Sequence, residues 1–330
     1  MRKLFLIIYS VFALHTYAQD PVFTQNFMMP ETISSSFTGA AETLKLGAIY
    51  RNQWRGLAFK TNTTFAYIDG YVDKFRSGIG ISILHQRENA TKYQFTQVNA
   101  NYALKIRLND EWYFRPSISI GLGIKDYAFN NVILEDQIDI TSGFIDPNTI
   151  DPILVEERRN FFDFSSSILF NNETSWIGIT VKHLNKPNIS LTEGGNTPLD
   201  MFFSVHGSME FDIFKYNNNK DDHSVFALAN YMQQGQYGRL DIGAQYVFNG
   251  QFSTGLTMTT NPVKPDEKSP VLTSINPFIG LRWKEFKFGL SYDINTTDIG
   301  NTGGVFEFLL SYELDNFVNE GLLKCRPSYF

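Results

Sequence analysis

The stretch LDMFFSVHGSMEFDI, residues 199–213, separates into two sets when every second residue is taken. One set is apolar: Leu199, Met201, Phe203, Val205, Gly207, Met209, Phe211 and Ile213. The other is mostly polar: Asp200, Phe202, Ser204, His206, Ser208, Glu210 and Asp212. Because successive side chains of a β-strand point to opposite faces, this stretch is predicted to be one long strand with an apolar side and a polar side.

The same alternation recurs along the chain, in FKFGLSYDI (286–294), RLDIGAQYVF (239–248), VFEFLLSYEL (305–314) and VNANYALKIRL (98–108). It predicts about fourteen strands of the roughly ten-residue length that a tilted membrane strand needs. The predicted strands lie near residues 43–51, 59–69, 76–87, 93–107, 111–127, 161–171, 174–184, 199–214, 223–233, 236–248, 250–260, 270–284, 285–295 and 303–314.

The predicted connections alternate in length. Counted from the first hairpin, odd-numbered connections are mostly long, such as the segment 128–160 and NKPNISLTEGGNTP at 185–198. Even-numbered connections are mostly tight, such as LND at 108–110 and NG at 249–250. The exceptions are KYNNNKDDH at 215–223 and two short odd connections near Glu88 and Gln234. Long loops at one end and tight turns at the other are typical of bacterial outer-membrane barrels.

Alternation alone also permits a soluble β-sandwich, whose apolar faces point inward. The strands are long for a sandwich, and a barrel explains both the loop pattern and the two faces. Apolar stripes would face lipid, while Lys105, Asp200 and Glu210 would face a hydrated lumen. We therefore predict an all-β fold, a multi-pass transmembrane antiparallel β-barrel of the outer membrane, over residues 43–314.

Three of the four tryptophans lie beside predicted tight turns. Trp112 and Trp176 open strands, and Trp283 closes one. Indole is apolar in body and polar at its N–H, so aromatic girdles form at membrane interfaces. The three side chains are expected to lie at the same membrane edge.

The two ends of the chain fall outside the strand pattern. Residues 1–18 combine Arg2 and Lys3, an apolar run and small residues before Gln19, which predicts a removed signal peptide. Residues 19–42 lack alternation, and they are predicted either to plug the lumen or to lie in the periplasm. Residues 315–330 are predicted to form a periplasmic tail, which contains Cys325, the single cysteine of the chain.

Composition and motifs argue against several function classes. The formal net charge of -6 and pI near 5.4 offer no basic field for nucleic acid. A single cysteine excludes an intramolecular disulfide framework and a Cys-rich zinc site. No nucleophile and base stand at a recognisable spacing, so we expect no enzyme activity, no cofactor and no metal centre. The acidic residues of the segment 128–160 could bind calcium or simply be solvated.

Several motifs carry a family resemblance. They are Asp20-Pro21, Phe23, Gln25 and Gly39-Ala40 at the predicted mature start, YRNQWRG at 50–56, HLNKP at 183–187 and GLSYD at 289–293. In these motifs the chain resembles the PorP/SprF-like outer-membrane proteins of the Bacteroidota type IX secretion system. It departs from the family at Met29-Pro30 and at Ser36-Phe37-Thr38-Gly39, where the family often has Asn-Pro and Ala-Tyr-Ala-Gly.

The resemblance implies a barrel that binds the C-terminal domain of a secreted cell-surface adhesin, supporting its export and its anchoring in gliding motility. Other type IX secretion or gliding components and outer-membrane lipid would be further partners. The candidate partner-binding residues are Trp54, Arg55, Gly56, His183, Asn185 and Pro187. A purely structural role stays open for both motifs. Residues 50–56 would then be a well-packed first hairpin, and residues 183–187 a strand end turned by Asn and Pro. The alternative function is a passive outer-membrane channel or small-solute transporter.

Overall fold

The protein is described by a computed structural model that covers residues 19–127, 138, 144–146, 158–191, 194–214, 223–262, 271–297 and 302–314. The strands of this part are β1 (Leu44–Gln53), β2 (Thr61–Val72), β3 (Ser77–Glu88), β4 (Gln94–Leu104), β5 (Ile106–Arg107), β6 (Tyr113–Asp126), β7 (Arg158–Asn171), β8 (Ser175–Lys182), β9 (Phe202–Phe214), β10 (His223–Gln234), β11 (Tyr237–Phe248), β12 (Phe252–Thr260), β13 (Leu272–Trp283), β14 (Phe286–Asn295) and β15 (Val305–Leu314).

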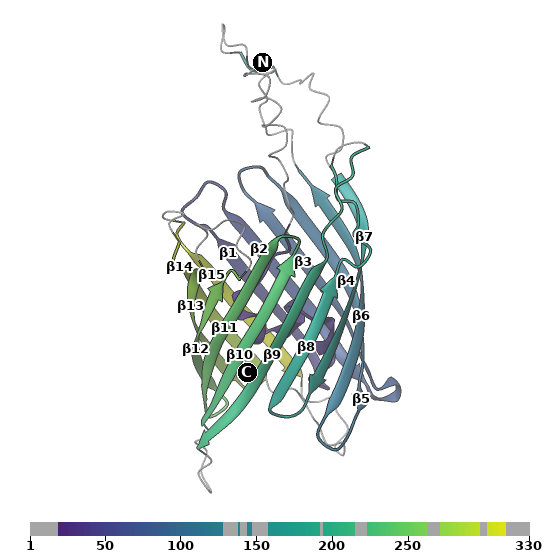
Figure 1. Cartoon of the computed structure of the whole chain (residues 1–330), viewed down its shortest axis with the longest axis vertical. Helices are drawn as coiled ribbons and strands as arrows, with labels where there is room; N and C mark the ends of the chain where they lie inside the picture. The colour runs from purple at the N-terminus through teal and green to yellow at the C-terminus, as the bar shows by residue number, and fades with distance from the viewer. Residues whose placement is uncertain are drawn as a thin grey trace.

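All strands belong to one closed antiparallel sheet (Figure 1). Neighbours in sequence pair with each other, and β1 pairs with β15 along its whole length. The short β5 continues β4 after an interruption at Lys105, and both pair with β6. Counted this way the barrel has 14 strands, which confirms the predicted fold class and strand number.

Most predicted strands match the observed ones within a few residues. The opening stretch is shorter than predicted, because β9 begins at Phe202 and not at Leu199. Leu199 lies before the strand, where its N–H donates to the carbonyl of Pro187 at 2.9 Å. β8 likewise ends at Lys182, two residues early, because His183 has a left-handed backbone with φ of 59°.

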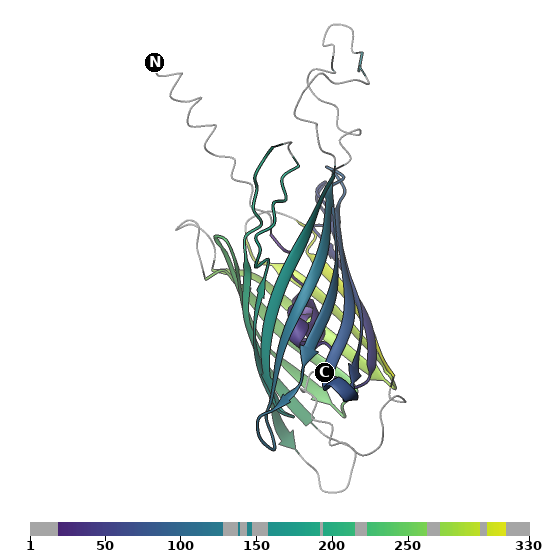
Figure 2. The same cartoon turned by 90° about the vertical axis from the view of Figure 1, so that its right-hand side faces the viewer.

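The connections segregate by length as predicted. The β8–β9 connection rises at the upper end in Figures 1 and 2, while the tight β4/β5–β6 and β7–β8 turns lie at the lower end. Outer-membrane barrels carry their long loops outward, so we call the upper end the outer end and the lower end the inner end.

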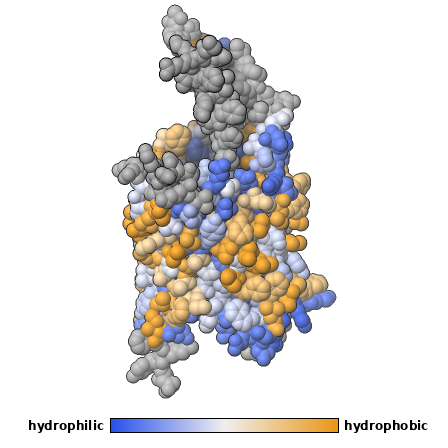
Figure 3. All heavy atoms as spheres, viewed as in Figure 1, coloured by the Kyte–Doolittle hydropathy of each residue, from blue (hydrophilic) through white to orange (hydrophobic). Residues whose placement is uncertain are grey.

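The two faces of the strands also lie as predicted. In the opening stretch Met201, Phe203, Met209, Phe211 and Ile213 are 37% to 50% exposed on the outside, and the alternating Ser204, His206 and Ser208 are buried. Hydrophobic side chains gather over the middle of the visible wall, and hydrophilic side chains gather toward its ends (Figure 3). An outer face of this kind is stable against hydrocarbon and excludes the sandwich alternative.

The expected tryptophan girdle is wrong for one of its members. Trp283 is 59% exposed on the outside, but Trp176 is only 5% exposed. Its ring packs in the lumen against Phe37, with 5.0 Å between centroids in an edge-on arrangement. The alternation of β8 explains this, since Ile177 and Ile179 take the outward positions and leave Trp176 the inward one.

Residues 19–43, which we call the plug, lie inside the barrel (Figure 2). They form three short 3-10 turns, η1 (Thr24–Phe27), η2 (Pro30–Thr32) and η3 (Ser35–Phe37). Of the two placements considered for this segment, the structure has the lumenal one. Asp20 lies at the outer end beside His183 and Gln234, and Thr43 leads into β1 at the inner end, so the plug passes through the whole lumen.

An apolar core forms between plug and wall despite the polar lumen. It unites Phe23, Phe27, Met28 and Met29 of the plug with wall residues such as Phe278. No helix in the described ranges is long and apolar enough to cross a membrane. The predicted signal peptide, the predicted tail with Cys325 and most of the segment 128–160 lie outside the described residues.

Candidate functional site

The inward face of the barrel holds the plug by buried charges. Arg51 of β1 contacts Glu307 of β15 and lies 3.1 Å from Asp293 of β14. The backbone N–H groups of Thr24 and Gln25 donate to the two Glu307 oxygens at 2.8 and 3.0 Å, and the Thr24 hydroxyl donates to Asp293 at 2.7 Å. This cluster therefore supplies acceptors to the first two backbone N–H groups of η1, as buried N–H groups require.

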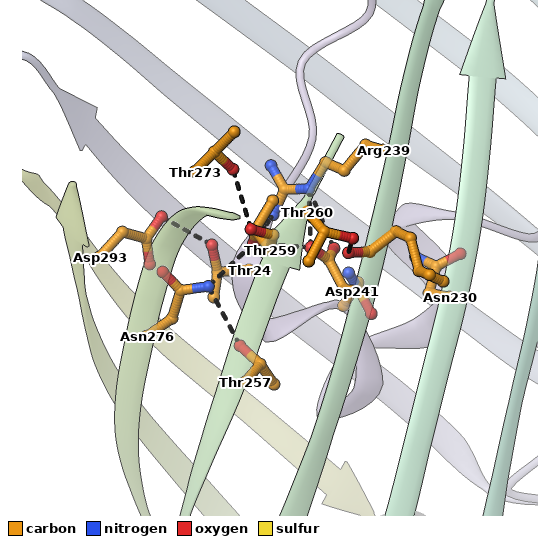
Figure 4. A network of polar contacts seen from close by, with 12 residues as sticks. Thr24, Asn230, Arg239, Asp241, Thr257, Thr259, Thr260, Thr273, Asn276 and Asp293 are labelled. Atoms are coloured by element: carbon orange, nitrogen blue, oxygen red, sulfur yellow. Dashed lines mark hydrogen bonds and ion pairs between the residues drawn. The ribbon is translucent and has the colours of Figure 1, made fainter. Parts of the chain in front are cut away.

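Beside this cluster, the wall is hydrogen-bonded within itself (Figure 4). On β11, Asp241 accepts from Arg239 at 2.9 Å and from the hydroxyl of Thr259 on β12 at 2.7 Å. On β13, Asn276 donates to Thr259 at 3.0 Å and to Thr257 at 3.2 Å. These side chains fix one another, so this part of the lumen is preorganised.

The rest of the plug meets wall cations along its length. Lys45 pairs with Glu31 at 2.8 Å, and Lys105 contacts Glu42. The Lys287 ammonium donates to the Met28 carbonyl at 2.7 Å. Buried ions need partners because desolvation is costly, so plug and wall satisfy each other.

At the outer end, His183 joins the plug to the wall. Its two ring nitrogens donate to Asp163 of β7 and to Asp20 of the plug, both at 2.9 Å. The backbone N–H of Asp20 also donates to the Gln234 side chain at 2.7 Å. We call this arrangement of Asp20, Asp163 and His183 the outer latch.

The electrostatics of the outer latch favour its charged form. Burial alone would lower the pKa of His183, but the charge of Asp20 and hydrogen bonds to Asp163 and Asp20 raise this pKa to about 9. Burial would raise the pKa of Asp20, but the His183 charge, their hydrogen bond and the Lys182 charge lower it to about 2. Both groups are therefore ionised at neutral pH.

Near its inner end the plug touches the wall backbone to backbone. Gly39 turns with φ of +65°, a conformation that suits glycine. A Cβ atom added to Gly78 of β3 would lie 2.0 Å from the carbonyl oxygen of Thr38. Only glycine fits at this contact.

The lumen is not completely filled. A cavity of about 70 Å³, partly open to solvent, remains between the plug and the wall of β2 to β8. Its wall side carries mainly hydroxyl and amide groups, among them Ser82, Asn101, Ser119, Ser167 and Thr180. In the described part of the chain, no group of three or more His, Cys, Asp or Glu side chains has an arrangement that could hold a metal ion.

Comparison with known proteins gives the family. The model of the type IX secretion system membrane protein PorP/SprF matches residues 15–312. The chain belongs to the PorP/SprF family. It is accordingly a multi-pass β-barrel of the outer membrane and a member of a type IX secretion family. No curated protein matches the sequence.

Several solved structures match most of the chain at low TM-scores and low sequence identity. The toluene transporter TodX of P. putida has a TM-score of 0.46 and 8% identity, over 89% of this chain and 94% of that one. The Acinetobacter baumannii outer membrane protein Omp33 has a TM-score of 0.44 and 6% identity, over 84% and 100%. The KdgM porin has a TM-score of 0.35 and 9% identity, over 82% and 99%.

The first candidate partner-binding group of this PorP/SprF protein lies on the β1–β2 connection at the outer end. Trp54 is 40% exposed with φ of 59°, and Arg55 is exposed. The N–H of Gly56 donates to the carbonyl of Thr302 at 3.0 Å, which ties this connection to the β14–β15 connection. Trp54 and Arg55 are therefore presented to the outside on a braced loop.

The second group is mostly structural in its contacts. His183 is 1% exposed and faces the lumen. Asn185 bonds to the backbone of β7, and Pro187 is buried. The structure does not bring this group together with Trp54 and Arg55. The β1–β2 connection is bonded to the β14–β15 connection, whereas His183 and Asn185 are bonded to β7.

Of the residues that hold the plug, His183 was among the candidates and the others were not, although the family motifs contain several of them. Asp20, Gln25, Arg51, Ser291 and Asp293 all come from the motifs that carry the resemblance to the PorP/SprF family, and each of them contacts another residue inside the barrel. One signal could have found the charged cluster. The first and last strands of a closed barrel pair, and opposite charges stand on their lumen faces at Arg51 and Glu307.

Proposed function

We propose that this PorP/SprF barrel is a non-enzymatic outer-membrane receptor. It binds the C-terminal domain of a secreted cell-surface adhesin at its outer end, which supports export of the adhesin and its anchoring for gliding motility. Other type IX secretion or gliding components would hold the barrel in the machinery. The observation that carries the proposal is the plug, whose polar contacts with the wall extend from Asp20 to Glu42. A filled barrel suits a rigid platform with contact surfaces on its loops.

The second candidate is a passive channel or small-solute transporter. The cavity beside the plug favours it, because the wall side of that cavity carries mainly hydroxyl and amide groups. Conductance of the purified full chain in planar bilayers separates the two functions. A receptor with a seated plug should stay silent, and a channel should give steady single-channel steps.

Co-purification from native membranes tests the receptor directly. A tagged full-length barrel should recover a large secreted protein, and the Trp54→Ala/Arg55→Ala double variant should recover much less. The matched control is Trp283→Ala/Arg107→Ala, which removes the same residue types at the inner end, where Trp283 is 59% exposed. Recovery of the wild-type barrel without cargo would contradict the receptor function. Equal losses in both double variants would contradict the role of Trp54 and Arg55.

A further inference from the structure

Among the described residues, the outer half of β7 has a neighbouring strand on one side only. β6 pairs with β7 along its whole length, from Arg158 to Asn171. β8 pairs with β7 only from Ser166 to Asn171, since β8 ends at Lys182 and the left-handed His183 turns the chain away. Figure 1 shows the outer part of β7 rising at the outer end of the barrel. In the part of the chain that the structure describes, no strand pairs with this edge of β7 above the point where β8 stops.

The Asn185 side chain occupies the first hydrogen-bonding position of this open edge. The Leu184 N–H donates to the Phe164 carbonyl at 2.9 Å. The Asn185 side-chain amide accepts from the Phe164 N–H at 3.2 Å and donates to the Phe162 carbonyl at 2.7 Å. One side-chain amide therefore takes the place of a peptide group in the missing strand. The backbone of this edge therefore donates and accepts hydrogen bonds as it would beside a neighbouring strand.

These contacts also show which backbone groups face the open side. In an antiparallel ladder the direction of the backbone groups alternates, so Arg158 and Asn160 share the direction of Phe162 and Phe164. The N–H groups of Phe162 and Asn160 and the carbonyls of Asn160 and Arg158 face no strand in the described ranges. Four hydrogen-bonding groups are available there in the register of a β-strand.

The side chains around the edge indicate the kind of segment that fits. Phe162 is 64% exposed and Leu184 is 48% exposed, so the edge offers apolar contacts. Arg158 and Lys186 are exposed, while Asp163 points into the lumen toward His183. The exposed charges of residues 158–165 and 183–187 are therefore positive. They favour an acidic partner and oppose pairing with the same edge of a second copy.

We propose that the outer edge of β7, residues 158–162, binds an extended partner segment of alternating acidic and apolar residues as an added antiparallel β-strand. Main-chain hydrogen bonds would give affinity, and the apolar and positive side chains would give selectivity. The proposal rests on the receptor function in one respect, because the segment would belong to the secreted adhesin.

Proline substitution tests the edge without touching the β6 ladder. In Asn160→Pro the lost N–H is one that faces the open side, and proline is tolerated on edges of this kind. Asn160→Val keeps the N–H and is the matched control. Arg158→Glu is a second variant that keeps the whole backbone ladder and reverses the charge. Heat-modifiable migration of each variant checks that the barrel has folded.

The probe is a fluorescent eight-residue peptide of alternating Glu and Val, and its partner probe replaces Glu by Lys. Fluorescence anisotropy is measured against the full-length barrel in detergent. We expect the Glu peptide to bind and the Lys peptide not to bind. Loss of a charge-independent backbone hydrogen bond should weaken binding about tenfold in Asn160→Pro, whereas Asn160→Val should stay within about twofold of wild type. Arg158→Glu should weaken the Glu peptide and strengthen the Lys peptide.

Three results with the purified barrel would overturn the proposal. They are no binding of the Glu peptide, equal binding by wild type and Asn160→Pro, and a wild-type dimer in light scattering that Asn160→Pro abolishes. The dimer would mean that a second copy occupies the edge. Cargo co-purification keeps the two proposals apart. If wild type and Asn160→Pro recover cargo equally, the receptor function stands and the edge proposal fails, whereas absence of cargo from wild type contradicts the receptor function itself.

Discussion

At the scale of single residues, the backbone conformation of His183 determines where its side chain lies. Its left-handed φ of 59° ends β8 and turns the imidazole inward between Asp163 and Asp20. Non-glycine residues adopt this region uncommonly, and they persist there when the surroundings fix them. Two carboxylates supply that fixation. The residue belongs to the attachment of the plug and not to the exposed outer surface.

The outer latch should weaken in alkali. The raised pKa of His183 means that its contribution is complete below about 6.5 and is lost as pH rises through about 9. The lowered pKa of Asp20 means that its contribution is present above 3.8 and is lost only as pH falls through about 2. Between pH 6.5 and 9 each pH unit can remove up to about 1.4 kcal/mol.

A spin label attached at Pro21→Cys in a Cys325→Ser background would report this loosening. We expect label mobility to increase as pH rises through 9, because neutral His183 no longer attracts Asp20. His183→Gln, which keeps hydrogen bonding without the charge, should flatten the profile. A wild-type label whose mobility is independent of pH would contradict the latch.

Removal of one member of the charged cluster at Arg51 should lower the free energy of unfolding strongly. Arg51→Met would leave Glu307 and Asp293 buried without their cation, and removing one partner of a buried pair costs about 3–5 kcal/mol. The control is Arg107→Met, since Arg107 and Asp110 form an exposed pair whose loss should cost less than about 1 kcal/mol. Urea unfolding of the barrel in detergent measures both. Similar losses would show that the cluster carries little energy.

At the scale of elements, the strands could be predicted because lipid and lumen impose the same period of two on every one of them. The alternation of β8 by itself places Trp176 in the lumen. The girdle prediction for Trp176 was wrong because it relied instead on the general preference of tryptophan for membrane edges. The plug could not be located in the same way. Residues 19–43 have no regular period, and their position depends on contacts with distant partners such as Glu307 and His183.

The candidate site shows the same division. Trp54 and Arg55 lie on an outer loop, as their place after a predicted strand implied. The plug contacts need the strand register, which fixes Arg51 opposite Glu307 only after the barrel is closed. A sequence shows the charges on one face of each strand, but their height in the lumen depends on tilt and register.

The glycines of β2 and β3 give a matched pair for testing how closely the plug sits on the wall. Gly78→Ala would place a Cβ atom 2.0 Å from the Thr38 carbonyl oxygen, so the plug must shift. Overpacking of this kind costs about 1–3 kcal/mol. Gly70→Ala meets only Leu44 Cδ1 at 3.6 Å and should change the free energy of unfolding by less than about 1 kcal/mol. Equal unfolding midpoints for the two variants would mean that the plug is not in tight contact there.

At the scale of the whole molecule, the path of the plug sets the topology. The chain enters at the outer end, where Asp20 bonds His183 and Gln234, and it reaches the inner end at Glu42, which pairs with Lys105 just before β1. Residues near Asp20 should therefore be reachable from the cell surface although they precede the first strand. Residues 19–43 of the chain occupy much of the lumen, and a cavity remains beside them.

Cysteine labelling on intact cells tests this path in the Cys325→Ser background. A membrane-impermeant maleimide should react with Pro21→Cys, and it should also react with Arg55→Cys on the outer β1–β2 connection. Asp110→Cys, at the inner tight turn where the Asp110 side chain is 97% exposed, should react only after the outer membrane is permeabilised. Arg55→Cys fixes the orientation of the barrel independently of the plug. If Pro21→Cys behaved like Asp110→Cys while Arg55→Cys still reacted, the barrel would keep its orientation and the outward start of the plug would be wrong.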